Sequence, residues 1–154
     1  MQSCTLTIGQ ARRFLLTKHG LVGQYTFSGK DGVLAYVRQA GCIQFDPVDI
    51  CGRNAELVLQ SRVDDLSKQT LYDLLYVDRR LIDYFDKNLA ILPVEDWPYF
   101  ERTRQHNRHN GRARDEIDAI ANEVKTRIRE KGAACSNAIG FDQTLVWHWG
   151  TNTK

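Results

Sequence analysis

Two short strand-like runs, preceded by several short helical segments, constrain the fold of this chain more than any other feature. Residues 81–85 and 89–92 are rich in the apolar and aromatic residues typical of strands. The three residues between them, Asp86-Lys87-Asn88, are a plausible turn. The pattern predicts a β-hairpin.

The segments before the hairpin have apolar residues at helical spacing. Asp31 could cap the second of these helices and Gly41 would end it, while Asp65 or Ser67 could cap the fourth. Helices followed by a hairpin form the winged-helix pattern, a variant of helix-turn-helix, so we expect a mainly α fold with small β wings (α+β). The expected helices are residues 8–19, 31–40, 53–62 and about 70–76.

Two further helices are expected after the hairpin. One begins at the acidic stretch Glu95-Asp96-Trp97-Pro98 and continues to about Asn110. A longer one spans residues 113–131, where Ile117, Ile120, Ala121, Val124 and Ile128 form an apolar stripe.

The composition is that of an ordinary globular protein. The 154 residues are 42% hydrophobic and 26% charged, so bulk disorder is not expected. No apolar run is long enough to cross a bilayer, and the N-terminus lacks the pattern of a signal peptide, so a cytoplasmic location is expected. The four cysteines form no CxxC pair, which argues against a zinc site and a disulfide framework.

The net charge of +2 is unevenly distributed. Residues 1–63 have seven Lys/Arg against four Asp/Glu, residues 64–101 have four against nine, and residues 102–131 have nine against five. Two basic segments therefore flank an acidic one. This pattern permits an anionic partner on one face without requiring it.

The segment Gln44-Phe45-Asp46-Pro47-Val48 is the candidate active site. In a strand from Cys42 to Asp46, the amide and the carboxylate would point to one face, with Cα atoms roughly 6.6 Å apart, and Phe45 would point into a core. Such a pair could hold one water or face a developing positive charge. The alternative to a catalytic role is a structural one. Asp-Pro commonly starts a turn, and a glutamine at the end of a strand is often merely solvated.

The chain resembles the N-terminal part of the winged-helix DNA glycosylases that unhook interstrand crosslinks, the YcaQ/AlkZ type. The resemblance extends over about residues 8–150 and is specific through the order and spacing of its pieces. Those pieces are residues 11–15, 32–41, 43–48, 57–62 and 92–100.

This resemblance implies a function and a site. The family's catalytic motif is Gln, an apolar residue, then Gln or Asp, and Gln44 and Asp46 match it. Family members excise N7-alkylated purines, including crosslinked guanines, from double-stranded DNA without a metal or organic cofactor. Many members have a His-Glu pair beside the wing where this chain has Lys87-Asn88, which leaves the detail of substrate choice open.

Family members are more than twice as long and contain further winged-helix modules. The resemblance therefore implies tandem modules, with residues 1–110 as the first and residues 111–154 as the incomplete start of a second. A truncated second module would leave an apolar edge exposed, which is compatible with a homodimer. Weak or no activity is expected of the chain alone, because lesion binding in such proteins uses several modules.

Binding to DNA would be mostly electrostatic, through phosphate contacts that do not read sequence. Two other interpretations stay open: a non-catalytic, regulator-like DNA-binding module, and a folded but inactive fragment. The third helix, with Glu56 as its only charged residue between positions 54 and 60, argues against strong reading of the major groove. The candidate phosphate-binding residues are Arg12, Arg13, Arg53, Arg62 and Lys87.

Overall fold

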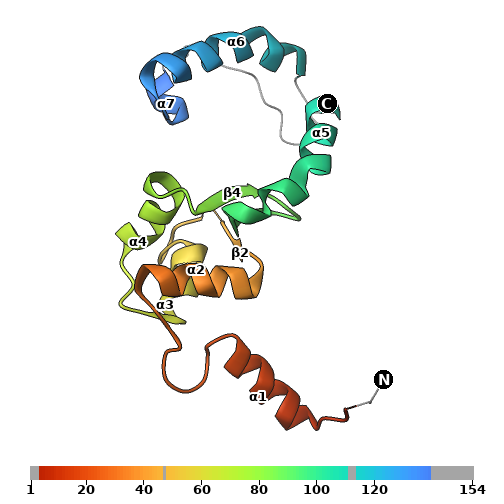
Figure 1. Cartoon of the computed structure of the whole chain (residues 1–154), viewed down its shortest axis with the longest axis vertical. Coiled ribbons are helices and arrows are strands. Elements are labelled where there is room, and N and C mark those ends of the chain that lie inside the picture. The colour runs from red at the N-terminus through yellow and green to blue at the C-terminus, as the bar shows by residue number, and fades with distance from the viewer. Residues whose placement is uncertain (1–3, 47, 111–113, 140–154) are drawn as a thin grey trace. The chain divides into compact units, whose positions relative to one another are not determined.

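The computed structural model describes residues 4–46, 48–110 and 114–139, and the chain divides into two compact units, Met1–Phe100 and Glu101–Lys154. The predicted class is confirmed in its coarse form, since helices are combined with two small sheets (Figure 1). The predicted division into a first module, residues 1–110, and a second module, residues 111–154, stays a prediction.

The first helix, α1 (Ile8–Lys18), is confirmed and has a regular start. Thr7 accepts a hydrogen bond from the backbone N–H of Gln10, and the Gln10 side chain bonds back to the backbone of Thr7. This reciprocal capping box satisfies two backbone N–H groups that a helix start leaves unpaired. The apolar residues of the helix are not buried, however, and Phe14 and Leu15 are exposed.

The second helix, α2 (Gly29–Ala40), begins two residues earlier than expected. Ser28 is the residue at its N-cap position, so Asp31 lies in the first turn and the prediction that it caps the helix is wrong. Gly41 ends the helix as predicted, with a φ of +84° that favours glycine.

Two further helices precede the hairpin, as predicted. One is α3 (Asn54–Gln60), and the other is α4 (Lys68–Tyr72), which continues into a π-helical turn, η1 (Asp73–Val77). Ser67 caps α4 in a reciprocal arrangement with Thr70, so of the two predicted caps it is Ser67 that acts.

The predicted hairpin is confirmed as β4 and β5, and it belongs to a three-stranded antiparallel sheet in the order β2-β5-β4. Its turn is closed by a hydrogen bond from the Asp86 N–H to the Asn88 carbonyl at 3.1 Å. A second sheet is a parallel pair, β1 with β3. The strands are β1 (Phe27–Ser28), β2 (Ile43–Gln44), β3 (Val63–Asp64), β4 (Leu81–Phe85) and β5 (Leu89–Pro93).

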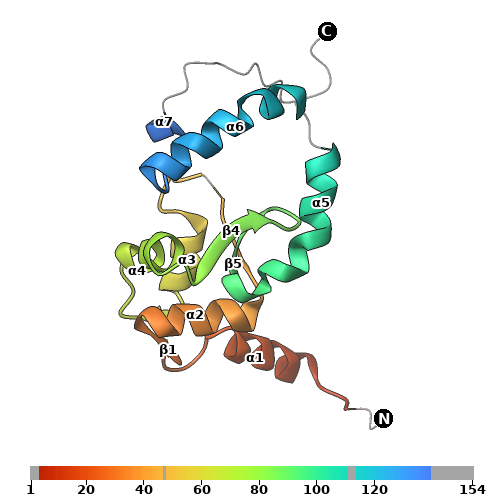
Figure 2. The same cartoon turned by 45° about the horizontal axis from the view of Figure 1, so that its top comes forward.

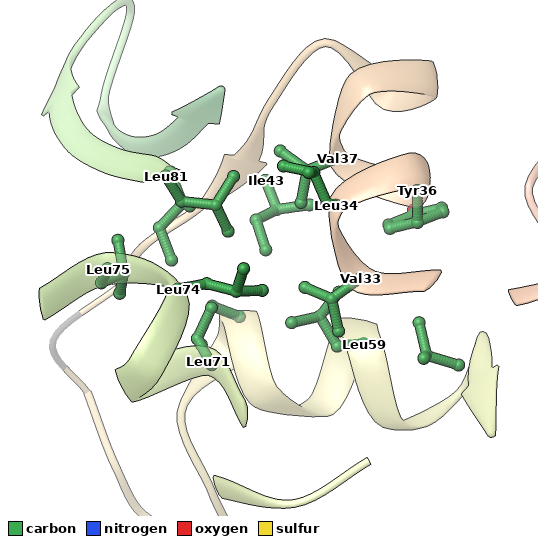
Figure 3. Packing of buried hydrophobic residues seen from close by; sticks show 13 residues of the cluster. Val33, Leu34, Tyr36, Val37, Ile43, Leu59, Leu71, Leu74, Leu75 and Leu81 are labelled. Atoms are coloured by element: carbon green, nitrogen blue, oxygen red, sulfur yellow. The ribbon is translucent and has the colours of Figure 1, made fainter. Parts of the chain in front are cut away.

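Helices α2 and α3 contact these strands, and α4 contacts α2 and η1, so that together they surround the core of the first unit (Figure 2). Figure 3 shows leucines of α4 and η1 meeting apolar side chains of α2, α3 and the sheet. Leu34, Leu59, Leu74, Leu81 and Ile91 are among the largest fully buried side chains. The core therefore connects the hairpin rigidly to the helices before it.

A 3₁₀ segment, η2 (Val94–Phe100), follows the hairpin where a helix was expected to begin. The second unit contains α5 (Glu101–Asn110), α6 (Arg114–Lys131) and α7 (Ser136–Ile139). The long helix predicted over residues 113–131 is thus confirmed for its described part. Of its predicted stripe, Ile120, Ala121 and Val124 are half-buried and Ile128 is exposed.

Within residues 4–46, 48–110 and 114–139, no helix combines the length and the apolar character that spanning a membrane requires.

Candidate active site

The candidate catalytic segment begins in β2 and leaves it before Asp46. The strand includes only Ile43 and Gln44, although the Phe45 N–H still bonds to the Leu89 carbonyl at 2.9 Å. Ile43 is buried and Phe45 packs on the core cluster, whereas Gln44 is exposed. Side chains therefore alternate between the two faces from Ile43 to Phe45, as expected. The strand itself is shorter than the expected Cys42 to Asp46.

Asp46 forms a local turn through one of its carboxylate oxygens. Its Oδ1 accepts a hydrogen bond from the Val48 N–H at 2.9 Å, the pattern of an Asx turn. Among the described residues, Oδ2 of this half-buried side chain has no hydrogen-bond partner. Pro47, the remaining residue of the turn, lies outside the described residues. The structural interpretation of Asp46 is thus correct for Oδ1, which forms the turn. The turn does not use Oδ2.

Gln44 lies between two open hollows. One, of about 190 Å³, is lined also by the hairpin turn, including Lys87 and Asn88. The other, of about 420 Å³, is lined also by Asn54 and Arg62. The pairing of Gln44 with Ala90 brings the glutamine to the hairpin, since these two residues are neighbours across the sheet. Gln44 thus shares one hollow with the hairpin turn and the other with residues of α3.

Two of the candidate phosphate-binding arginines, Arg53 and Arg62, make contacts within the protein. Arg53 lies at the N-cap of α3, and its Nε is 3.7 Å from a carboxylate oxygen of Asp49. Arg62 donates to the Val58 carbonyl at 2.8 Å and to the Ser61 hydroxyl, and its guanidinium carbon is 5.4 Å from the center of the Tyr36 ring. These contacts fix both guanidinium groups beside α3.

The other three candidate DNA contacts are exposed. Arg12 and Arg13 lie on α1, and Lys87 lies in the hairpin turn. Lys87 and Arg62 each share a hollow with Gln44, whereas Arg53 lines a different one. The structure therefore brings two of the five predicted cations to the glutamine.

Several polar and aromatic side chains of this region were not predicted. Asn54 and His19 line the larger hollow beside Gln44. Tyr72 and Tyr76 line a third hollow, of about 250 Å³, whose wall includes Phe45. Nothing in the local sequence identifies them, because each comes from a segment that reaches the site only through tertiary packing.

Among the described residues, no three His, Cys, Asp or Glu side chains are grouped so that they could hold a metal ion. The expectation that the chemistry needs no metal or organic cofactor stays a prediction.

Comparison with known proteins gives the family. A family model described as DNA glycosylase AlkZ-like matches residues 37–154, more than half of the chain. The chain belongs to the AlkZ-like DNA glycosylase family. No curated protein and no solved structure matches it.

Membership in the AlkZ-like family confirms the predicted resemblance to glycosylases of the YcaQ/AlkZ type. It makes the chain a member of a family of DNA-repair glycosylases, which are hydrolases acting on DNA. The match begins within α2, so it includes Gln44 and Asp46 and does not include α1 with Arg12 and Arg13.

Proposed function

We propose that this chain is the winged-helix portion of a monofunctional DNA glycosylase that hydrolyses the N-glycosidic bond of N7-alkylated or crosslinked purines. The observation that supports it most is the environment of the Gln44-Phe45-Asp46 segment, which lies inside the family match. Gln44 is exposed beside the hairpin turn, and Asp46 keeps one oxygen without a partner among the described residues.

The order of elements supports a winged-helix module. Helix α2 is followed by β2, then by α3, by α4 with η1, and by the β4–β5 hairpin. Strand β2 pairs with β5, the last strand of the hairpin, so the hairpin would be the wing. We further propose that residues 111–154 belong to a second module, through which the chain forms a homodimer.

The chemistry of the lesion suits a site with few catalytic groups. Alkylation at N7 makes the purine cationic, so it leaves without being protonated by the enzyme. Positive charge then develops on the sugar, and a nearby carboxylate stabilises it. Asp46 would do so through Oδ2 and would accept a proton from the attacking water, because the turn occupies only Oδ1.

Gln44 would position that water. A glutamine amide both donates and accepts hydrogen bonds, but it is not a base at neutral pH. Its exposure next to the two hollows makes it accessible to water and to a nucleotide.

The decisive test compares Asp46→Asn and Gln44→Ala in release of 7-methylguanine from methylated duplex DNA, under single-turnover conditions with protein in excess. Asparagine can still accept the Val48 N–H bond, so the turn is kept and only the charge is lost. We expect Asp46→Asn to lose about 10²- to 10⁴-fold in rate while keeping its affinity for DNA. Gln44→Ala should lose less. Unchanged excision by Asp46→Asn would refute the assignment of Asp46.

The two alternatives give different results in the same assays. A regulator-like DNA-binding module would release no 7-methylguanine but would bind plain duplex DNA with an affinity that falls as salt is added. An inactive fragment would do neither. Helix α3 argues against the regulator, since it has Glu56 as its only charged residue and no basic residue to place in the major groove.

A further inference from the structure

Two exposed tyrosines on the helix before the hairpin have no role in the core. Tyr72 and Tyr76 are 53% and 50% exposed, although the neighbouring Leu71, Leu74 and Leu75 are buried. Their ring centers are 5.0 Å apart, at an angle of 57°. An adjacent, solvent-facing aromatic pair is a binding surface for another planar group.

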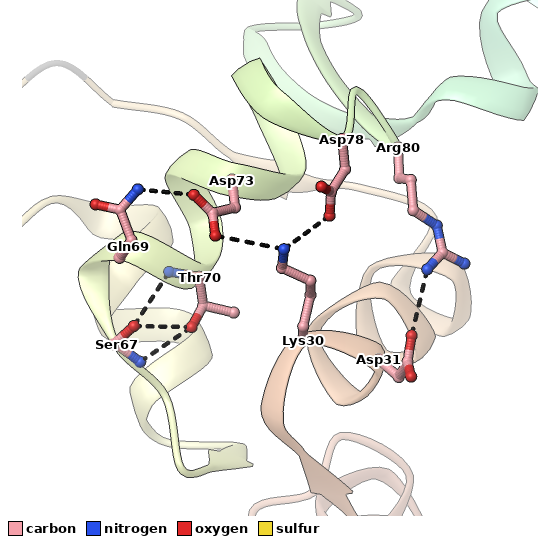
Figure 4. A network of polar contacts seen from close by, with 8 residues as sticks. All are labelled: Lys30, Asp31, Ser67, Gln69, Thr70, Asp73, Asp78 and Arg80. Atoms are coloured by element: carbon pink, nitrogen blue, oxygen red, sulfur yellow. Dashed lines mark hydrogen bonds and ion pairs between the residues drawn. The ribbon is translucent and has the colours of Figure 1, made fainter.

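The backbone that presents these rings is firmly held. Tyr76 lies in the π-helical turn η1, and single π turns are frequent at functional sites. Lys30 of α2 contacts Asp73 at one end of the turn and Asp78 just after the other, with Nζ–oxygen distances of 3.3 and 2.8 Å (Figure 4). Gln69 adds a hydrogen bond to Asp73 at 2.7 Å.

The hollow of about 250 Å³ beside the tyrosines has the chemistry of a purine site. Its apolar wall includes Tyr72, Tyr76 and Phe45, and its polar rim includes Glu56 and Arg53. Glu56 is half-buried. Enzymes that act on an extruded base commonly hold it between aromatic or apolar side chains and contact its edge with polar groups.

The rim of the hollow carries Arg53 and Lys68 against Glu56, so the attraction for a cationic base comes from the aromatic wall and not from the net charge. Aromatic faces attract cations, and the Glu56 carboxylate adds negative charge nearby. Burial and the neighbouring Asp83 both raise the pKa of Tyr76, so its phenol stays neutral and can donate a hydrogen bond. Lys68 lies 3.8 Å from Glu56 and is, with Arg53, a cation at the same rim for a DNA phosphate.

The hollow also adjoins the candidate catalytic segment. Phe45 forms part of its wall, and Asp46 is the next residue, with a Cα about 3.8 Å further along the chain. Gln44 and Asp46 do not line the hollow themselves, so the sugar of a base held there would have to reach past Phe45 to the neighbouring residue.

We propose that this hollow receives the extruded N7-alkylpurine of the substrate, with the cationic ring stacked against Tyr72 and Tyr76. This inference rests on the proposed glycosylase function and adds to it a base-recognition site.

The test uses the 154-residue chain and two duplexes, one containing N7-methylguanine and one containing a tetrahydrofuran abasic analogue at the same position. Tyr72→Ala and Tyr76→Ala should each slow single-turnover release of 7-methylguanine by about tenfold or more. Affinity for the abasic duplex should not change, because that duplex has no base to stack. Tyr72→Phe and Tyr76→Phe keep the rings and should retain most of the rate.

Tyr25→Ala is the matched control, because Tyr25 is 55% exposed and does not line the hollow. Its release rate should equal that of the wild type. Thermal unfolding of each variant checks that the fold is intact, and the phenylalanine variants test the rings in a way that does not depend on losing a large side chain.

The outcomes separate this inference from the proposed function. If the wild type releases no 7-methylguanine, the proposed activity fails for this chain, and binding then decides on the base site: it fails too if the wild type does not bind the N7-methylguanine duplex more tightly than the abasic duplex. If the wild type is active, Asp46→Asn is inactive and both alanine variants stay within twofold of the wild type, only the base site is overturned. Equal loss of affinity for the abasic duplex would also overturn it, because the tyrosines would then contact the DNA backbone.

Discussion

Asp46 shows how one residue can satisfy two interpretations at once. Asp-Pro predicts a turn, and Asp46 Oδ1 indeed accepts the Val48 N–H. The proposed catalytic role requires only the other oxygen. A carboxylate oriented by a backbone donor has lost part of its rotational freedom, which favours a defined position for its free oxygen. The turn therefore supports the site.

Gly32 is the residue at which a minimal substitution should be most damaging. A Cβ at this position in α2 would lie 2.9 Å from the carbonyl carbon of Phe27, so backbone must move to accept it. We expect Gly32→Ala to lower the free energy of unfolding by about 1–3 kcal/mol, measured by urea denaturation.

Gly9 in α1 provides the control for that substitution. No atom lies within 4 Å of a Cβ built there, so Gly9→Ala should be neutral or stabilising by up to ~1 kcal/mol. Equal effects of the two alanines would show that the close approach to Phe27 does not limit stability.

At the scale of elements, helix α2 holds the others through polar contacts on its exposed side. Lys30 contacts Asp73 and Asp78 at the two ends of η1, and Arg80 contacts Asp31 at 3.3 Å (Figure 4). Arg38 pairs with Glu95 of η2. Exposed pairs contribute little to stability one by one. Their value here is geometric, since they fix the segments on either side of the hairpin to one helix.

The pKa of Asp73 reports on this arrangement. Its pKa is lowered, first by the hydrogen bond from Gln69 and then by Lys30. Gln69→Leu and Lys30→Met should therefore each raise the Asp73 pKa, as measured by ¹³C NMR of the carboxyl carbon during a pH titration. Gln60→Leu on α3, a matched change away from Asp73, should leave the pKa unchanged.

The sign of the linked effect on stability follows directly. A carboxyl group whose pKa is lower in the folded state stabilises the fold above its unfolded pKa, about 3.9 for Asp, and this contribution is lost as the pH falls through the folded pKa. Part of the acid sensitivity below about pH 4 should thus disappear in Gln69→Leu. An unchanged pH profile would contradict this assignment.

At the scale of the whole molecule, the core belongs to the first unit. Every fully buried side chain in the described part of the chain lies between residues 32 and 93. The described side chains of residues 101–139 are at most half-buried. The first unit therefore has what independent folding requires, a contiguous core of its own.

We expect a chain of residues 1–100 to unfold cooperatively in urea, with the same midpoint as the corresponding transition of the whole chain. Leu74→Ala in this shorter chain should cost about 2–5 kcal/mol, because Leu74 is fully buried in the core. A broad transition without a cooperative midpoint would indicate that the first unit depends on the remainder of the chain.

Local patterns were sufficient to predict most elements. The helices ending at Lys18 and Ala40 and the hairpin around Asp86-Lys87-Asn88 have periodicity and turn residues within a few positions of one another, so short windows contain their signal. The same is true of the candidate pair Gln44 and Asp46, which are two residues apart.

Tertiary packing decided the surroundings of that pair. Strands β1 and β3 have two residues each and pair Phe27 with Val63, far apart in the chain, and two residues are too few for any periodicity. The approach of Lys87 to Gln44, the contacts of Arg62 and the hollow beside Tyr72 and Tyr76 depend in the same way on long-range pairing and on the shared core. The chemistry of the site is thus encoded locally, because it needs particular side chains. Its accessibility and its neighbours are set by contacts between segments that are distant in the chain.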